Sequence, residues 1–259
     1  MTAAQRVASR DNPLLVRLRR LIRDPAAYRK QAEVWLEGEH LCRALIGRGQ
    51  RPAQAVIADS AWQRDDLRAL AQAAPRVVIV PDPLFAGVSA LPSPAALGFV
   101  WPLPAAAVIA PDAATVVLDR IQDAGNVGSI LRSAAAFGVA QVLALAGTAA
   151  LWSPKVLRAG MGAHFALALI EGLVAADLCA LRVPLVGTRV RAATDLRRCA
   201  LPSPCAWLFG HEGQGAAEEL LARCTLVARI PQPGGEESLN VAAAAAVCLY
   251  EGVRQRGGQ

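Results

Sequence analysis

The stretch TVVLDRIQDAGNVGSILRSAAAFG, residues 115–138, decides the fold. Its first part is an apolar run typical of a buried strand, and its second part has the small and apolar residues of a helix. A strand that passes through glycines into a helix is one step of an α/β layer. The glycines read G-N-V-G, so this is neither the dinucleotide fingerprint nor a P-loop. Arg132 is charged among small and apolar neighbours, and a function must explain it.

Apolar runs alternate with helical patterns along the rest of the chain, which predicts an α/β fold. In the first part, strands are expected at 53–58 and 76–81, with a helix over 60–73 between them. In the second part they are expected at 115–121, 141–146, 183–188, 205–210 and 225–230. These later strands are apolar nearly throughout, as in a parallel sheet covered on both faces. The last helix is expected to begin near Ser238.

A stretch rich in proline and alanine, residues 88–115, interrupts any long element and marks the domain boundary. We expect a small first domain over residues 1–104 and a second domain over 105–259. A chain of 259 residues is long enough for each part to bury a core of its own.

The composition excludes several classes of protein. With 54% hydrophobic and 19% charged residues the chain is globular. No apolar run approaches the roughly 20 residues of a membrane helix, and the start lacks the apolar core of a signal peptide. We therefore expect a cytoplasmic protein without membrane contacts. The six cysteines have irregular spacings and only three histidines accompany them, which predicts reduced thiols and no metal site.

The net charge of +6 is concentrated in residues 1–30, which hold eight basic and two acidic residues. Asn12 and Pro13 predict the start of a helix whose apolar stripe is Leu14, Leu18, Leu21 and Ile22. Its arginines are suited to binding phosphate groups. A solvated helix face is an equal alternative, and acidic residues disfavour a transit peptide. The candidate RNA-binding residues are Arg10, Arg17, Arg19, Arg20 and Arg23.

Three segments with chemical content lie where predicted strands end, the usual ligand position in α/β sheets. They are DAGNVGSILRSA at 123–134, FGHEGQG at 209–215 and IPQPGGEESLNV at 230–241. Their glycines expose backbone groups and leave room for a largely uncharged ligand such as adenosine. Each segment taken alone is also compatible with an ordinary tight turn.

Together these motifs resemble the SpoU/TrmH branch of the SPOUT RNA methyltransferases. The set is N-x-G-x-x-x-R-x-A from Asn126, F-G-x-E-G-x-G from Phe209, and I-P followed by S-L-N-V from Ile230. SPKVLRAGMGAHF at 153–165 adds to the likeness, and residues 1–104 look like the small α/β RNA-binding domain of many members. The resemblance implies a homodimer with a trefoil-knotted C-terminal region that moves a methyl group from S-adenosylmethionine to a ribose 2′-hydroxyl.

The resemblance also implies roles for single residues. Thr188, Gly210, Ile230 and Leu239 would bind the cofactor. Arg132 would act on the ribose hydroxyl and Asn126 would position it. Because an arginine keeps its proton in proteins, we favour Arg132 as a group that stabilises alkoxide charge or grips a phosphate, and proton removal stays open. The rest of the expected catalytic set is Glu212, Ser238 and Asn240.

Departures from the family pattern are Ala124 in place of proline and Gly160 in place of serine, and His211 is bulkier than expected. His211 is either a substrate contact or a plain loop histidine. Ribosomal RNA is the expected substrate, because a basic helix on a small domain suits a folded RNA surface. The alternatives are methylation of transfer RNA, a non-catalytic RNA-binding protein of this fold, and a nicotinamide oxidoreductase, which the missing fingerprint disfavours.

Overall fold

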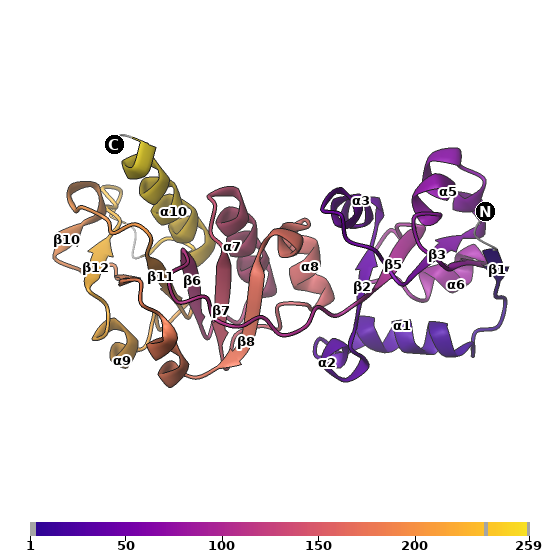
Figure 1. The fold of residues 1–259 in the computed structure, drawn as a ribbon, viewed down its shortest axis with the longest axis horizontal. Helices are drawn as coiled ribbons and strands as arrows, with labels where there is room; N and C mark the ends of the chain where they lie inside the picture. Colours follow the sequence, from indigo (N-terminus) through magenta and orange to yellow (C-terminus); the bar gives the residue numbers. More distant parts are fainter. Residues whose placement is uncertain (1–3, 236–237, 258–259) are drawn as a thin grey trace. The chain divides into compact units, whose positions relative to one another are not determined.

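The computed structural model describes residues 4–235 and 238–257 (Figure 1). By its internal contacts the chain divides into two compact units, one of Met1–Ala105 with Trp152–Phe165 and one of Ala106–Leu151 with Ala166–Gln259. The segment Trp152–Phe165 belongs to the first unit because Trp152 and Phe165 pack on Trp101, with ring centroids 5.7 and 5.4 Å away. A functional division near residue 104 stays a prediction.

The first unit is a mixed five-stranded sheet with helices, in the strand order β1-β4-β3-β5-β2. Strands β1, β4 and β3 are parallel to one another, whereas β5 pairs antiparallel with both β3 and β2. The strands are β1 (Ala4–Arg6), β2 (Glu33–Glu37), β3 (Gln54–Ala58), β4 (Val77–Val80) and β5 (Leu97–Pro102). The helices are α1 (Pro13–Arg23), α2 (Ala27–Gln31), α3 (Glu39–Gly47), α4 (Asp59–Trp62), α5 (Asp65–Ala71), α6 (Asp82–Ala86) and α8 (Pro154–Gly160).

Two expectations for this unit need correction. The helix expected over 60–73 is two short helices, α4 and α5, because Arg64 between them adopts an extended conformation. Strand β5 lies inside the stretch that was expected only to interrupt the chain. Its residues from Leu97 to Trp101 are buried between β3 and β2, so tertiary pairing outweighs the prolines on either side.

The basic helix forms as predicted. The side chain of Asn12 accepts a hydrogen bond from the backbone of Leu14 at 2.9 Å and caps α1, and Pro13 occupies its first turn. The buried stripe contains Leu15 and not Ile22, which is half-buried. Arg17 forms an ion pair with Glu33 at 2.8 Å, and Arg19 donates to the carbonyl of Arg10.

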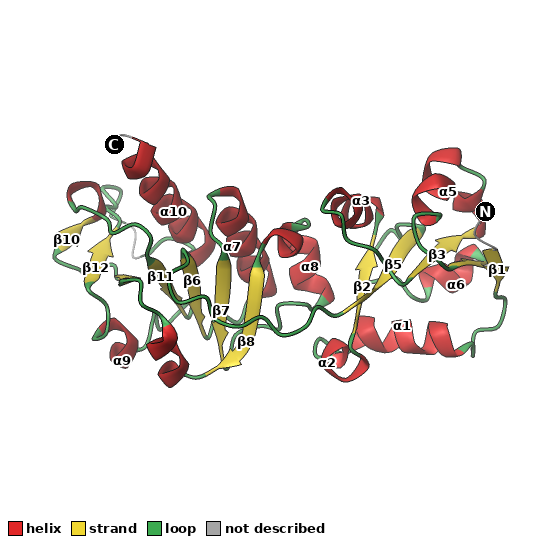
Figure 2. Ribbon diagram, in the orientation of Figure 1, coloured by secondary structure: helices red, strands yellow, loops and turns green. Residues whose placement is uncertain are grey.

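The second unit is a seven-stranded sheet in the order β10-β12-β9-β11-β6-β7-β8, and every pair in it is parallel (Figure 2). The predicted parallel sheet is therefore confirmed. Its strands are β6 (Thr115–Asp119), β7 (Gln141–Leu145), β8 (Ala168–Leu173), β9 (Leu185–Thr188), β10 (Thr194–Asp195), β11 (Ala206–Gly210) and β12 (Leu226–Arg229). The edge strands β8 and β10 were not expected, because β8 is only partly buried and β10 is very short.

Helices cover this sheet. Helix α10 (Val241–Gly257) packs against α7 (Ala124–Ala136) and β11, and α9 (Glu218–Leu221) lies on the opposite side in Figure 1. The described residues also form short 3-10 helices, η2 (Ala175–Ala180) and η3 (Leu196–Arg198) in this unit and η1 (Ala163–Ala166), which lies mostly in the first. A core of strand and helix residues that includes Val117, Leu143 and Leu208 fixes the layers.

The ends of the two long helices are set by side-chain caps. The carboxylate of Asp123 accepts from the backbone N–H of Asn126 at 2.8 Å, so α7 begins at Ala124. Asn126 therefore lies within the first turn of the helix. Asn240 accepts from the backbone N–H groups of Ala242 and Ala243, so α10 begins at Val241 and not near Ser238.

Candidate cofactor and active site

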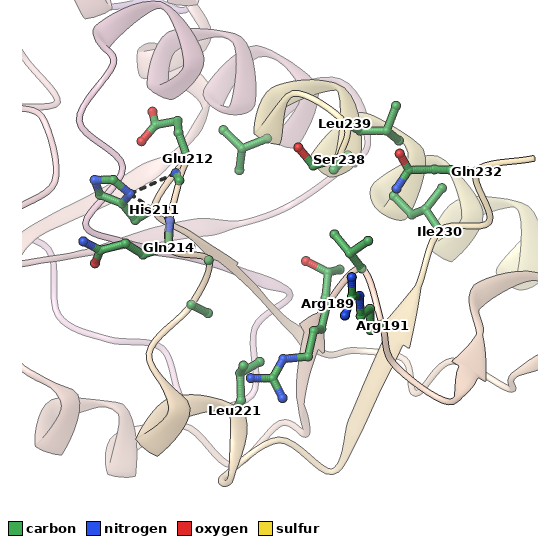
Figure 3. A pocket seen from close by; sticks show the side chains of 18 residues that line it. Arg189, Arg191, His211, Glu212, Gln214, Leu221, Ile230, Gln232, Ser238 and Leu239 are labelled. Atoms are coloured by element: carbon green, nitrogen blue, oxygen red, sulfur yellow. Dashed lines mark hydrogen bonds between the residues drawn. The ribbon is translucent and has the colours of Figure 1, made fainter. Parts of the chain in front are cut away.

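A pocket of about 680 Å³ opens at the carboxyl ends of the central strands of the second unit (Figure 3). Because the sheet is parallel, the loops after β9, β11 and β12 meet at the same edge. In Figure 3, His211, Glu212 and Gln214 lie on one side, and Ile230, Ser238 and Leu239 lie on the other. The volume lies within the range of pockets that hold small molecules and cofactors, roughly 300–1,000 Å³.

The pocket contains every residue that the sequence predicted for the cofactor site, namely Thr188, Gly210, Ile230 and Leu239. Glu212 and Ser238 from the predicted catalytic set also line it. Sequence reasoning missed four polar residues of the lining. Each follows a strand end by one to four residues, and that position was the signal available for finding them. They are Arg189, Arg191, Gln214 and Gln232.

Gly210 is required by close backbone packing at the end of β11. A Cβ atom at this position would lie 2.0 Å from the backbone nitrogen of Ala216 and 2.3 Å from the carbonyl carbon of Gly215. Real Cβ contacts are never so short, and backbone atoms cannot turn aside as a flexible side chain can. The loop from His211 to Ala216 thus folds back directly over the strand end. Only a glycine permits this path.

A polar network joins three of the predicted catalytic residues. The carboxylate of Glu212 accepts hydrogen bonds from the side chain of Asn126 at 3.1 Å and from the backbone N–H groups of Asp123 and Gln122 at 3.1 and 3.3 Å. The side-chain oxygen of Asn126 accepts in turn from the amide of Asn240 at 2.9 Å. The network ties the starts of α7 and α10 to the loop after β11.

The charge of Glu212 is stabilised within this network. Partial burial acts to raise the pKa of its carboxyl, but the hydrogen bonds from Asn126 and from backbone N–H groups outweigh it and lower that pKa below its usual value. Glu212 is therefore an anion at neutral pH. His211 beside it accepts from the backbone of Gly213 at 3.0 Å through Nδ1, so this ring supports the turn of its own loop.

Arg132 stands apart from the network. It is exposed on α7, and within residues 4–235 and 238–257 its side chain has neither a hydrogen bond nor an ion pair. It does not line the pocket. The fold thus brings together Glu212, Asn126 and Asn240 but leaves the guanidinium of Arg132 without a described intramolecular partner.

Other predictions concern metals, thiols and membranes. In the part of the chain that the structure describes, no cluster of three His, Cys, Asp or Glu side chains is placed to bind a metal ion. The six cysteines are free thiols. A search of the same residues found no helix with the length and hydropathy to cross a bilayer.

The parallel sheet, the glycine loops at its carboxyl edge and the polar network define an α/β enzyme domain with a cofactor-sized pocket. The family described as SpoU rRNA Methylase matches residues 113–250, which is most of the second unit. The chain belongs to this family, and the resemblance found in its motifs is confirmed. It is an RNA methyltransferase.

Individual relatives agree. A protein of Synechocystis described as an uncharacterized tRNA/rRNA methyltransferase is 31% identical over 96% of this chain and 94% of its own length. The 23S rRNA (guanosine-2′-O-)-methyltransferase RlmB of Bordetella pertussis is 37% identical, over 58% of this chain and 63% of its own. A solved RNA 2′-O ribose methyltransferase has a TM-score of 0.82 and 28% identity over 97% of this chain and 99% of its own. The AdoMet-bound rRNA methyltransferase of Sinorhizobium meliloti has a TM-score of 0.84 and 26% identity over 98% of both chains.

Proposed function

We propose that this protein transfers a methyl group from S-adenosylmethionine to a ribose 2′-hydroxyl of ribosomal RNA. The observation that carries the proposal is the pocket at the strand ends, directly beside the anionic network of Glu212, Asn126 and Asn240. Family membership supplies the reaction class, and the names of the RlmB relatives favour ribosomal RNA over transfer RNA.

The residues of the pocket fit this cofactor. The loop that Gly210 permits exposes backbone groups, and a side chain there would clash with the loop itself. Thr188, Gly210, Ile230 and Leu239 would hold the cofactor, largely through their backbone. When bound, its sulfonium supplies an already activated methyl group, so the protein's tasks are alignment and the management of one proton.

The chain's own residues would divide these tasks. Arg132 keeps its positive charge, and we assign it to the alkoxide that develops on the ribose or to an adjacent phosphate. Its lack of a described partner leaves the guanidinium available for substrate. Asn126 is held by Glu212 and Asn240, so its side chain is fixed where the RNA would enter. Ser238 and Asn240 complete the polar wall.

The first unit would bind the RNA. Among the described residues no side-chain partner is found for Arg10, Arg20 and Arg23, so these arginines are free for phosphates. Arg17 and Arg19 already have protein partners, which makes them weaker candidates.

We further propose a homodimer. Helix α10 leaves Val247 and Tyr250 exposed by 42% and 57%. They border an open hollow of about 200 Å³ together with Pro231 and Pro233. Exposed apolar patches of this kind mark protein interfaces.

With ribosomal RNA as substrate, the protein would act in the cytoplasm. A trefoil knot in residues 105–259 also stays a prediction.

The proposal is tested by mapping ribose methylation across all cellular RNAs with and without this protein. We expect one or a few ribosomal RNA riboses to lose methylation when it is absent. Loss of methylation at a transfer RNA ribose would identify transfer RNA as the substrate instead. Unchanged methylation in every RNA would favour a non-catalytic RNA-binding protein.

Once the target is known, Arg132→Ala tests the catalytic assignment. We expect methyl transfer to fall by about 10²–10³-fold, the usual effect of removing one charge-stabilising donor. Cofactor affinity and the melting temperature should stay unchanged, because Arg132 is exposed and has no described partner. Normal turnover in this variant would refute the role of Arg132.

A further inference from the structure

One carboxylate of the second unit is buried outside the polar network. Asp119, the last residue of β6, is only 3% exposed. No other Asp or Glu among residues 4–235 and 238–257 is buried to this degree. A buried charge is costly unless it is paired and hydrogen-bonded, so its partners show what it stabilises.

Asp119 has partners on two different segments. The guanidinium of Arg120 donates to both carboxylate oxygens, from Nε at 2.8 Å and from a terminal nitrogen at 3.1 Å. The backbone N–H of Ala217, which lies 98 positions further along the chain, donates to the same carboxylate at 2.8 Å. Asp119 thus fixes the far end of the loop that begins at Gly210.

Arg120 adopts an unusual backbone conformation to make this pairing. Its φ is +57°, in the left-handed region that residues other than glycine rarely enter. Such a conformation persists only where the surroundings require it. It lets the side chain fold back onto the neighbouring carboxylate, whereas consecutive side chains of a strand normally point to opposite faces.

The same guanidinium also reaches the middle of the loop. A second terminal nitrogen of Arg120 donates to the side-chain oxygen of Gln214 at 3.2 Å. The loop is therefore held at its middle through Arg120 and at its end through Asp119, while its beginning is fixed by the close packing of Gly210 on Ala216. Neither Asp119 nor Arg120 lines the pocket.

We propose that Asp119 and Arg120 are positioning residues that preset the cofactor loop, Gly210–Ala217, in its binding conformation. This inference rests on the proposed function, because it gives that loop to S-adenosylmethionine. The loop also carries Glu212, whose carboxylate accepts a hydrogen bond from Asn126. Without Asp119 and Arg120, the loop must be ordered at the moment of binding, and affinity is lost.

The test measures binding of S-adenosylhomocysteine, the product of the reaction, by calorimetry without RNA. Asp119→Asn keeps the size of the side chain but removes the charge that Arg120 and Ala217 face. We expect its affinity to fall about tenfold, the change that corresponds to one charge-assisted hydrogen bond. In methylation assays KM for the cofactor should rise while kcat at saturating cofactor stays close to that of the wild type.

Gln141→Leu is the matched control. Gln141 is buried like Asp119 and bonds to the backbone of Ala110 and to Thr115, but no residue of its network lines the pocket. We expect both variants to melt at lower temperature and only Asp119→Asn to lose affinity. Hydrogen exchange should accelerate at the amides of residues 211–217 in Asp119→Asn alone. Equal loss of affinity in both variants would reduce Asp119 to a structural role and overturn the inference.

A second variant keeps the proposal testable if Asp119→Asn fails to fold. Arg120→Lys retains a positive charge on a partly exposed side chain but lacks the guanidinium fork whose three nitrogens hold both oxygens of Asp119 and the side chain of Gln214. Weakened affinity for S-adenosylhomocysteine in this variant supports the role of Asp119 and Arg120. Wild-type affinity together with unchanged hydrogen exchange in the loop overturns the proposal. If the wild-type protein itself does not bind S-adenosylhomocysteine, it is the proposed function that fails.

Discussion

Replacement of Glu212 probes the polar network most directly. In Glu212→Ala three donors lose their acceptor, namely the side chain of Asn126 and the backbone N–H groups of Asp123 and Gln122. Glu212→Gln has nearly the same shape but only one oxygen, so it keeps the two bonds of one carboxylate oxygen and loses the third. Comparison of the two variants therefore distinguishes the loss of one hydrogen bond to residue 212 from the loss of its whole side chain.

The magnitude follows from these bonds. One hydrogen bond contributes about 0.5–1.5 kcal/mol net, which gives about 1.5–4.5 kcal/mol for three. Because Glu212 is exposed and water can replace it, we take the lower part of the range, about 2 kcal/mol. If the network preorganises the pocket, Glu212→Ala weakens S-adenosylhomocysteine binding by up to about thirtyfold. Glu212→Gln should fall between the alanine variant and the wild type.

The same network predicts a pH dependence. Because the folded state lowers the pKa of Glu212 from its ordinary 4.5, the contribution of the carboxylate is fully present above that value and is lost as the pH falls through the lower folded pKa. Affinity for S-adenosylhomocysteine should therefore be steady from neutral pH down to pH 4.5 and fall only below that value, and this acid limb should be absent in Glu212→Gln.

Calorimetric titration of both variants, with hydrogen exchange at Gln122 and Asp123, checks the reasoning. The exchange of these two amides should accelerate in Glu212→Ala, because their acceptor is gone. Wild-type affinity together with wild-type exchange in Glu212→Ala would show that the network does not organise the pocket.

Further predictions concern the loop, the thiols and the basic helix. Gly210→Ala should abolish cofactor binding and destabilise the fold by at least about 1–3 kcal/mol, whereas Gly252→Ala, whose Cβ would lie 3.8 Å from its nearest neighbour Trp207, should be tolerated on both counts. Iodoacetamide should modify the exposed Cys179 first and reach Cys248 only on unfolding, because Cys248 is buried and burial raises the pKa of its thiol to about 12. Early loss of the Cys248 thiol in peptide mapping would contradict this prediction. The double variant Arg20→Ala with Arg23→Ala should lower the slope of log affinity for RNA against log salt by about 0.7–0.9 per lost contact. Arg17→Ala, which removes an ion pair with Glu33, should change this slope less. An unchanged slope in the double variant would exclude RNA contact by this helix.

The sequence by itself determined the fold class and the location of the candidate pocket. Buried parallel strands carry apolar residues on both faces, so the runs at 115–121, 141–146 and 205–210 identified the central strands without tertiary information. Strand ends in such a sheet meet at one edge, so the glycine loops after them predicted a shared pocket. The cap of α1 was equally local, because Asn12 and Pro13 act within one helical turn.

Other features depend on contacts between distant parts of the chain, and only the tertiary structure decided them. Asn126, in the first turn of α7, donates to Glu212 across 86 positions and accepts from Asn240 across 114. The need for glycine at 210 arises from the return of the chain at Ala216, which no propensity at 210 reports. Asp119 is an acidic residue inside the apolar run at 115–121, and its burial against Arg120 and Ala217 is a product of packing. Local patterns encode periodicity and caps, whereas the partners of a polar side chain are set by chain segments that sequence spacing does not bring together.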